Sequence, residues 1–87
     1  MKNRRDRIDI IISILESIEE DGQKSKPTHV LYRANLSHKL LKKYLQELEE
    51  KGFISFNEDK TILLLEKGKM FLSELRKMKR FMDMFNL

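Results

Sequence analysis

The sequence predicts an α+β fold that is mostly helical, with three helices, a two-stranded hairpin and an extended C-terminal helix. Four segments repeat apolar residues at the spacing of a helix face, and one pair of short segments is rich in aromatic and branched residues. Ser, Pro and Gly residues mark the ends of these segments. Because 87 residues suffice for one domain and an appended helix, we assign residues 1–66 to the domain and residues 67–87 to the final helix.

The first helix is expected over residues 6–21, with Asp6 as its N-cap and Gly22 as its end. Its inward positions are Ile8, Ile11, Ile12, Leu15 and Ile18. A short second helix is expected over residues 27–34, because Pro27 suits the first position of a helix. The inward residues expected in the second helix are Val30, Leu31 and Ala34.

The third helix is expected to begin after Ser37, a good N-cap residue, and to run to about Lys51. Its inward face comprises Leu40, Leu41, Tyr44, Leu45 and Leu48, and its outward face His38, Lys39, Lys42, Lys43 and Gln46. The bases lie early and the acids Glu49 and Glu50 lie late, which is the reverse of what the helix dipole favours. Because this order costs up to about 1 kcal/mol, we expect the bases to serve another purpose.

Residues 53–56 and 61–65 are expected to form two strands, joined by a polar turn over residues 57–60 that contains no Gly. The final helix is expected from about Glu66, and Gly68 is expected to weaken its first turn slightly. The order of these elements is helix, short helix, tight turn, amphipathic helix and hairpin. This is the order found in a winged helix-turn-helix domain.

In such a domain the third helix enters the major groove of double-stranded DNA with its N-terminal residues at the base edges. The residues expected at the bases are Ser37, His38, Lys39, Lys42, Lys43 and Gln46, and those expected on phosphates are Lys24, Lys26, Arg33 and the N-terminal Arg4, Arg5 and Arg7. The hairpin tip is acidic at Glu58 and Asp59, so we expect the wing to contribute little, with only Lys60 near a phosphate.

The distribution of charge agrees with a polyanionic partner. The net charge is +4 and the pI is about 9.4. Residues 23–46 carry six bases and no acid, whereas residues 8–22 and 47–60 each carry five acids. An acid-free segment between acidic ones predicts a focused cationic patch, although chance clustering in a Lys-rich chain remains the alternative.

Other classes of function find little support. There is no Cys, two His residues alone do not make a metal site, and no cofactor or small-molecule ligand is evident. Ser37 and His38 are neighbours on a helix and point about 100° apart, so they do not form a nucleophile and base pair; we expect no enzyme. The longest apolar run, residues 62–65, is too short for a membrane span, and we expect a cytoplasmic, nucleoid-associated protein.

The final helix carries an apolar stripe that predicts a homodimer. Its residues are Phe71, Leu75, Met78, Met82 and Phe85, with Phe81 beside them. Their spacing of four and three residues is typical of a coiled-coil seam. Near Phe71 and Leu72, we expect packing against the domain itself ahead of contact with a partner. The alternative for residues 78–85 is that the helix folds back on its own domain, and the spacing leaves open whether two helices would pair parallel or antiparallel.

The chain resembles an archaeal winged helix-turn-helix family of predicted transcriptional regulators over roughly residues 5–85. The resemblance rests on Tyr32 to Ser37, Leu40, Tyr44, Leu45 and Leu48, on Lys51 to Ile54, and on Glu66 to Gly68 with Phe71 and Leu72. It implies DNA binding by a homodimer joined through a C-terminal antiparallel coiled coil. Glu66 stands where family members often have Thr, a departure that alters a helix cap and not the DNA face.

Three alternatives remain beside a transcriptional regulator. A chromatin-like protein would use the same bases without sequence preference. A protein-interaction module would suit the acidic wing but not the basic third helix. Structured RNA would also attract the bases, but the sequence lacks an aromatic platform for single strands, since Tyr44 faces inward.

Overall fold

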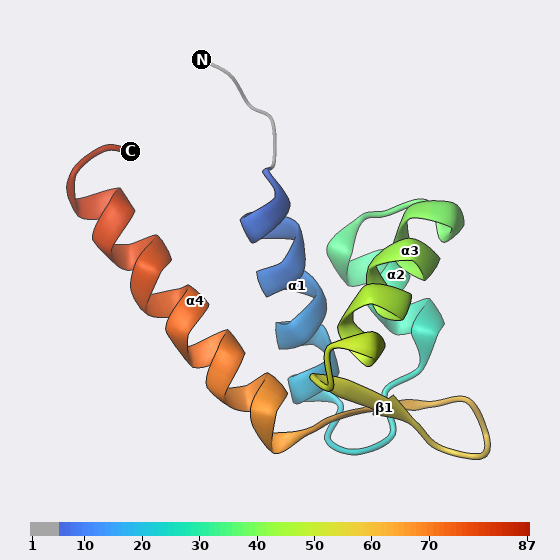
Figure 1. Cartoon of the computed structure of the whole chain (residues 1–87). Coiled ribbons are helices and arrows are strands. Elements are labelled where there is room, and N and C mark those ends of the chain that lie inside the picture. The colour runs from blue at the N-terminus through green and yellow to red at the C-terminus, as the bar shows by residue number, and fades with distance from the viewer. Residues whose placement is uncertain (1–5) are drawn as a thin grey trace.

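The computed structural model describes residues 6–87 and contains the elements in the predicted order (Figure 1). They are α1 (Arg7–Glu20), α2 (Pro27–Ala34), α3 (His38–Glu50), β1 (Ile54–Phe56), β2 (Ile62–Leu64) and α4 (Glu66–Met84). The fold class is confirmed: four helices and one antiparallel hairpin, mostly helical. β1 begins one residue later than predicted and ends at the predicted residue, whereas β2 is one residue shorter at each end.

The helix ends follow the local chemistry expected of them. The carboxylate of Asp6 accepts a hydrogen bond from the backbone N–H of Asp9, and the hydroxyl oxygen of Ser37 accepts one from Leu40. Both bonds satisfy N–H groups that have no partner within the helix. After α3 the chain turns at Gly52, whose φ of 80° lies in the left-handed region, where an L side chain is strained.

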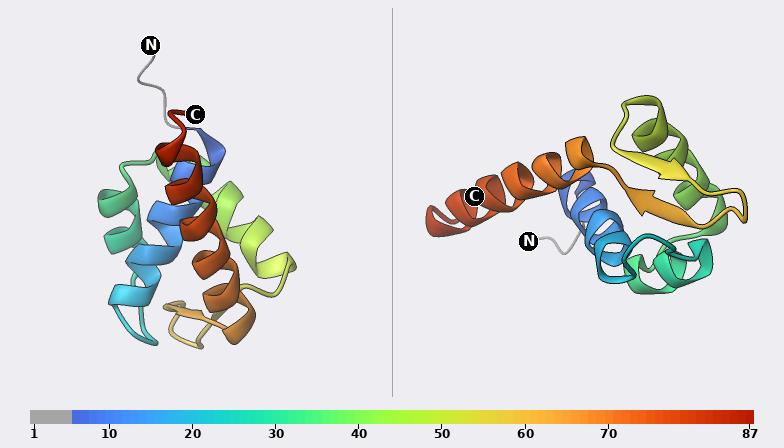
Figure 2. Two further views of the ribbon diagram at one scale, coloured as in Figure 1. Left: turned by 90° about the vertical axis from the view of Figure 1, so that its left-hand side faces the viewer. Right: turned by 90° about the horizontal axis from the view of Figure 1, so that it is seen from below.

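α1 lies at the centre of the molecule, between α2 on one side and α4 on the other, with the hairpin across their ends (Figures 1 and 2). Its residues Ile14, Leu15 and Ile18 are fully buried and pack in one core with side chains from every other element. These partners include Val30, Leu41, Leu45, Leu48, Ile54, Ile62 and Leu72. The apolar faces predicted for α1 and α3 are therefore the faces that build the core.

The hairpin is held to the rest of the domain through the loop before α2. β1 and β2 pair antiparallel, with Ile54 opposite Leu64 and Phe56 opposite Ile62. On the other edge of β2, Ser25 and Ile62 exchange two backbone hydrogen bonds of 2.9 and 2.7 Å. The loop thus adds a one-residue bridge to the sheet, and the hairpin and the start of α2 share backbone bonds.

Gly68 has a role beyond the one expected. A Cβ at this position would collide with the carbonyl oxygen of Phe53 and with the side chain of Leu64. The lack of a side chain is what allows the first turn of α4 to approach the hairpin closely. The sequence predicts only the weaker helix start at Gly68, and the close packing against Phe53 and Leu64 is an additional role that the structure reveals.

α4 runs back alongside α1 and is joined to it by ion pairs (Figure 1). The guanidinium of Arg76 contacts Glu16 and Glu19 at 3.0 Å each, and the Lys79 ammonium contacts Asp9 at 2.9 Å. The hydrogen bond from Lys79, together with its charge, lowers the pKa of the Asp9 carboxyl below its usual value although partial burial opposes this.

The apolar stripe predicted for the dimer interface is divided into two parts. Leu75 is buried in the domain's own core, and the ring of Phe71 stacks on Phe53. Both contacts lie within the chain: the packing of Phe71 on its own domain was expected, whereas Leu75 was predicted at the partner interface. The far half stays open: Met78 is 41% exposed and Phe81 61%, and Met82 is half-buried.

Candidate nucleic-acid interface

One side of α3 forms what we call the basic face, comprising Ser37, His38, Lys39, Lys42, Lys43 and Gln46. All six residues are exposed, whereas Leu41, Tyr44, Leu45 and Leu48 on the opposite side are buried. Packing of the apolar side fixes the rotation of the helix about its axis, and this rotation directs the basic face to solvent. The hydroxyl oxygen of Ser37 also caps the helix, as described above.

The charges along α3 are ordered as the sequence indicates. The first turn holds no acid and the last turn no base. Its late acids include Glu47, whose carboxylate accepts a hydrogen bond of 2.7 Å from Arg7. The pairing raises the pKa of the Arg7 guanidinium, which also lies over the ring of Tyr44. Arg7, expected on a phosphate, is thus paired with Glu47 in the C-terminal half of α3. Arg4 and Arg5 lie outside the residues that the structure describes.

The cations of the molecule divide into paired and unpaired groups. Among residues 6–87, the bases that contact carboxylates are Arg7 on α1, Arg33 on α2, and Lys69, Arg76, Lys77 and Lys79 on α4. No ion pair within the described part of the chain involves Lys39, Lys42 or Lys43 of the basic face, or Lys24, Lys26 and Lys60 near it. Lys51, Lys67 and Arg80 also form no ion pair among residues 6–87. The unpaired bases on and near the basic face differ in that they lie together, and they leave a positive potential there.

Arg33, like Arg7, is a predicted phosphate contact whose side chain binds other residues of the chain. Its guanidinium donates to the backbone oxygen of Ser17 at 3.2 Å and to the carboxylate of Asp21 at 3.1 Å. Burial opposes the charged form of Asp21, but the hydrogen bonds from Ser25 and Arg33 outweigh burial and lower its pKa. Arg33 therefore ties α2 to the end of α1, and we leave it out of the candidate interface.

The acidic hairpin tip has a structural use that the sequence did not reveal. The carboxylate of Asp59 accepts hydrogen bonds from the hydroxyl and the backbone N–H of Thr61. The Thr61 hydroxyl is the main cause that lowers the pKa of Asp59, and the charge of Lys24 adds to it. These bonds hold a turn that has no Gly and in which Lys60 takes a φ of 70°.

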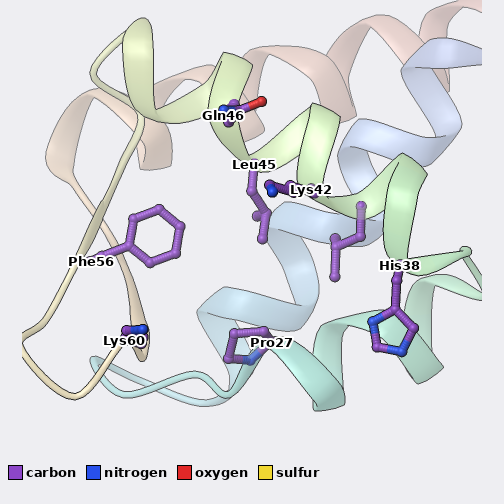
Figure 3. Close-up of a pocket in the computed structure, with 8 residues that line it drawn as sticks. Pro27, His38, Lys42, Leu45, Gln46, Phe56 and Lys60 are labelled. Carbon is purple, nitrogen blue, oxygen red and sulfur yellow. The ribbon is translucent and has the colours of Figure 1, made fainter.

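Between α3 and the hairpin lies a groove of about 610 Å³ (Figure 3). It is lined by Pro27, His38, Leu41, Lys42, Leu45, Gln46, Phe56 and Lys60. The ring of Phe56 points from the hairpin toward Leu45 of α3 (Figure 3). Sequence reasoning missed this groove because three separate elements contribute its walls. The one signal was Phe56, a large apolar residue next to the polar turn.

No group of three or more His, Cys, Asp or Glu residues in the described part of the chain is arranged to hold a metal ion. None of the helices that the structure describes combines the length and the apolar character needed to cross a bilayer.

Comparison with known proteins gives three findings. A profile of winged helix-turn-helix proteins matches residues 4–83. An uncharacterized protein of Methanocaldococcus jannaschii is 35% identical over 80 residues, which are 92% of this chain and 79% of the relative. The crystal structure of Sso10a-2, a DNA-binding protein from Sulfolobus solfataricus, superposes with a TM-score of 0.80 at 26% identity and covers 94% of this chain and 86% of its own.

Proposed function

Because the chain belongs to the winged helix-turn-helix family and its relatives are archaeal, we propose that it binds double-stranded DNA as a homodimer and regulates transcription. The observation that carries the proposal is that Lys39, Lys42 and Lys43 lie on an open helix face and form no ion pair among residues 6–87, whereas four of the six bases of α4 contact acids. The bases of this face have no carboxylate partner and lie at the helix end where the dipole disfavours positive charge. Contact with DNA phosphates would offset both costs.

The proposed contacts follow from the chemistry of the basic face. With α3 in the major groove, Gln46 is suited to a bidentate pair with adenine, and Lys42 to the acceptors of guanine. Lys24 and Lys26, exposed before α2 and free of ion pairs among the described residues, are placed on phosphates. Such contacts orient the protein without reading sequence.

The homodimer is proposed from the open half of α4. Met78, Phe81 and Phe85 remain exposed at 41%, 61% and 58%, and the rings of Phe81 and Phe85 lie 5.0 Å apart. Large apolar side chains in an exposed row favour a partner surface, and a second copy of α4 offers a matching one. Two α3 helices held at a fixed separation would reach half-sites about 34 Å apart, or a multiple of that distance.

Duplex binding measured across a range of salt concentrations tests the DNA proposal. Neutralisation of phosphates by six to eight bases per dimer gives a log–log slope of about −5 to −7. The variant Lys42→Glu/Lys43→Glu is expected to lose binding while its circular dichroism spectrum stays unchanged, since both side chains are exposed. A flat salt response in the wild type would reject the proposal.

The matched control is Lys51→Glu/Lys69→Glu, which changes the net charge equally at two exposed positions outside the basic face. We expect it to retain most of the affinity. Equal losses in both double variants would show that net charge alone governs binding. Comparable affinity for unrelated duplexes would favour the chromatin-like function with nucleoid association, whereas preference for an RNA duplex would favour RNA.

Light scattering tests the homodimer, with an expected mass of about twice 10.5 kDa. Phe81→Glu is expected to give the monomer, because it places a charge in the proposed apolar seam. A wild-type monomer at micromolar concentration would exclude the dimer. Duplex binding absent in a well-folded protein would favour the alternative of a protein-interaction module, for which the acidic hairpin tip and the open half of α4 are the surfaces to probe.

A further inference from the structure

The groove between α3 and the hairpin has the size and lining of a small-molecule site. Its volume of about 610 Å³ falls within the range of roughly 300–1,000 Å³ that is typical of ligand pockets. Its interior wall is apolar: Leu41 and Leu45 on α3, Pro27 at the start of α2, and Phe56 on β1. Phe56 keeps 37% of its surface exposed within this space, so an apolar ligand would remove further apolar surface from water.

The charged groups that line the groove, Lys42 and Lys60, share one sign. Its other polar side chains are His38 and Gln46, and no carboxylate among residues 6–87 lines it. Lys42 lies on the α3 side and Lys60 on the hairpin side (Figure 3). Neither lysine forms an ion pair or a side-chain hydrogen bond with the described residues. An apolar recess with two free ammonium groups at its edge is complementary to a molecule with an apolar body and one negative end.

We propose that this groove binds a small amphiphilic monoanion, such as a medium-chain fatty acid or an aromatic carboxylate, with its apolar body beside Phe56 and its carboxylate at Lys42 or Lys60. A neutral apolar ligand would leave the ammonium groups unused. A compact polyanion would leave Phe56, Leu41 and Leu45 without contacts. The monoanion uses both kinds of lining.

Occupation of the groove would compete with the basic face. His38, Lys42 and Gln46 belong both to the groove and to the set of residues placed at the DNA bases. A bound carboxylate would neutralise Lys42, and the ligand body would restrict Gln46. We therefore infer that the same ligand displaces DNA, a consequence that rests on the proposed function, whereas binding to the groove does not.

The test of the site uses the full chain without DNA. Fluorescence of anilinonaphthalene sulfonate reports binding of an apolar anion, and decanoate and decanol are then compared as competitors. We expect decanoate to displace the dye at a concentration at least about tenfold below that of decanol, since a charged hydrogen bond contributes about that factor.

Two variants locate the site and one controls for general effects. Phe56→Ser is expected to weaken dye binding at least about tenfold by removing the aromatic wall. Lys42→Gln/Lys60→Gln, confined to exposed side chains and so without effect on folding, is expected to remove the preference for decanoate over decanol. Met70→Ser, at an exposed apolar residue outside the groove, is expected to leave both measurements unchanged.

Each contrary result overturns a defined part of the inference. Equal displacement by decanoate and decanol would exclude the anion preference. Dye binding lost in Phe81→Ser but retained in Phe56→Ser would place the dye on α4 and exclude the groove. Displacement of a labelled duplex by decanoate is then measured by anisotropy. A protein that binds decanoate in the groove but binds no duplex would refute the proposed function alone.

Discussion

The rings of Phe53 and Phe71 stack with their centroids 4.2 Å apart and their planes 7° from parallel. Phe53 lies at the start of the hairpin and Phe71 in the second turn of α4, so the stack joins two elements directly. The carbonyl oxygen of Phe53 also accepts the backbone N–H of Leu65 at 3.0 Å and faces Gly68. Together these contacts set the direction in which α4 leaves the hairpin.

Replacement of Gly68 by Ala tests that close approach through the sign of its effect. Helix propensity alone predicts that Gly68→Ala stabilises an α-helix by about 1 kcal/mol. The collision with the Phe53 carbonyl predicts the opposite, a loss of about 1–3 kcal/mol or more, because backbone must move. Urea unfolding followed by circular dichroism measures the difference.

Gly52→Ala is the comparison for this experiment, because a Cβ there meets only the flexible end of Lys67. Its φ of 80° predicts a loss of about 1–2 kcal/mol from backbone strain alone. A stabilised Gly68→Ala protein would mean that α4 does not approach the hairpin as closely as described.

Leu75→Ala and Phe81→Ala are expected to separate stability from association. Leu75 is buried in the core, so its truncation should lower the free energy of unfolding by about 2–5 kcal/mol. Phe81 is mostly exposed and should change the stability of the monomer by less than about 0.5 kcal/mol. Unfolding measured at low protein concentration and sedimentation measured at high concentration distinguish the two effects, and reversed results would contradict the division of α4.

Arg33→Gln and Lys26→Gln are expected to differ in what they impair. Lys26→Gln, at a proposed phosphate contact, should weaken duplex binding and reduce the magnitude of the salt slope by about 1 for each bound protomer. Arg33→Gln should leave the slope nearly unchanged but lower stability, because the contacts with Ser17 and Asp21 are lost. A large change of the salt slope in Arg33→Gln would show that Arg33 does contact DNA phosphates.

Stability is expected to fall in acid through Asp9 and Asp21, whose pKa values are lowered in the folded protein. Ionised carboxylates with lowered pKa values stabilise the fold above the unfolded value of about 3.9, and the contribution disappears as the pH falls through the lower folded value. Asp21→Asn should therefore be less stable than the wild type at pH 7 and approach it near pH 2 in urea unfolding.

Glu58→Gln is the control for that measurement, since Glu58 is exposed at the hairpin tip and forms no ion pair within residues 6–87. Its unfolding curve is expected to follow that of the wild type across the pH range. A constant difference between Asp21→Asn and the wild type from pH 7 to pH 2 would show that the carboxylate acts through packing and not through its charge.

Much of the fold could be read from local patterns. The bounds of α1 and α3 followed from the spacing of their apolar residues and from the caps at Asp6 and Ser37. These signals could be recognised because each depends on neighbours within one turn of helix. The exposed state of Lys42 and Lys43 followed from the same periodicity. Whether these lysines contact DNA stays a prediction, because the contact requires a second molecule.

Features that depend on contacts between residues far apart in the chain could not be predicted from the sequence. Arg33 lies in an acid-free stretch and looks like a phosphate contact, but its partners Ser17 and Asp21 belong to the preceding helix and its end. Likewise, the seam pattern of α4 continues through Leu75 without a break, although the domain covers only its first half. Periodicity identifies an apolar face and not what covers it.

The two backbone bonds between Ser25 and Ile62 have a consequence for how this domain can vary. They join the wall that carries Pro27 to the wall that carries Phe56 without using any side chain that lines the space between those walls. The backbone on the two sides of this space is therefore held by bonds that do not depend on the lining residues. Substitutions at Phe56 or Lys60 would change the side chains that line the space while these backbone bonds are kept.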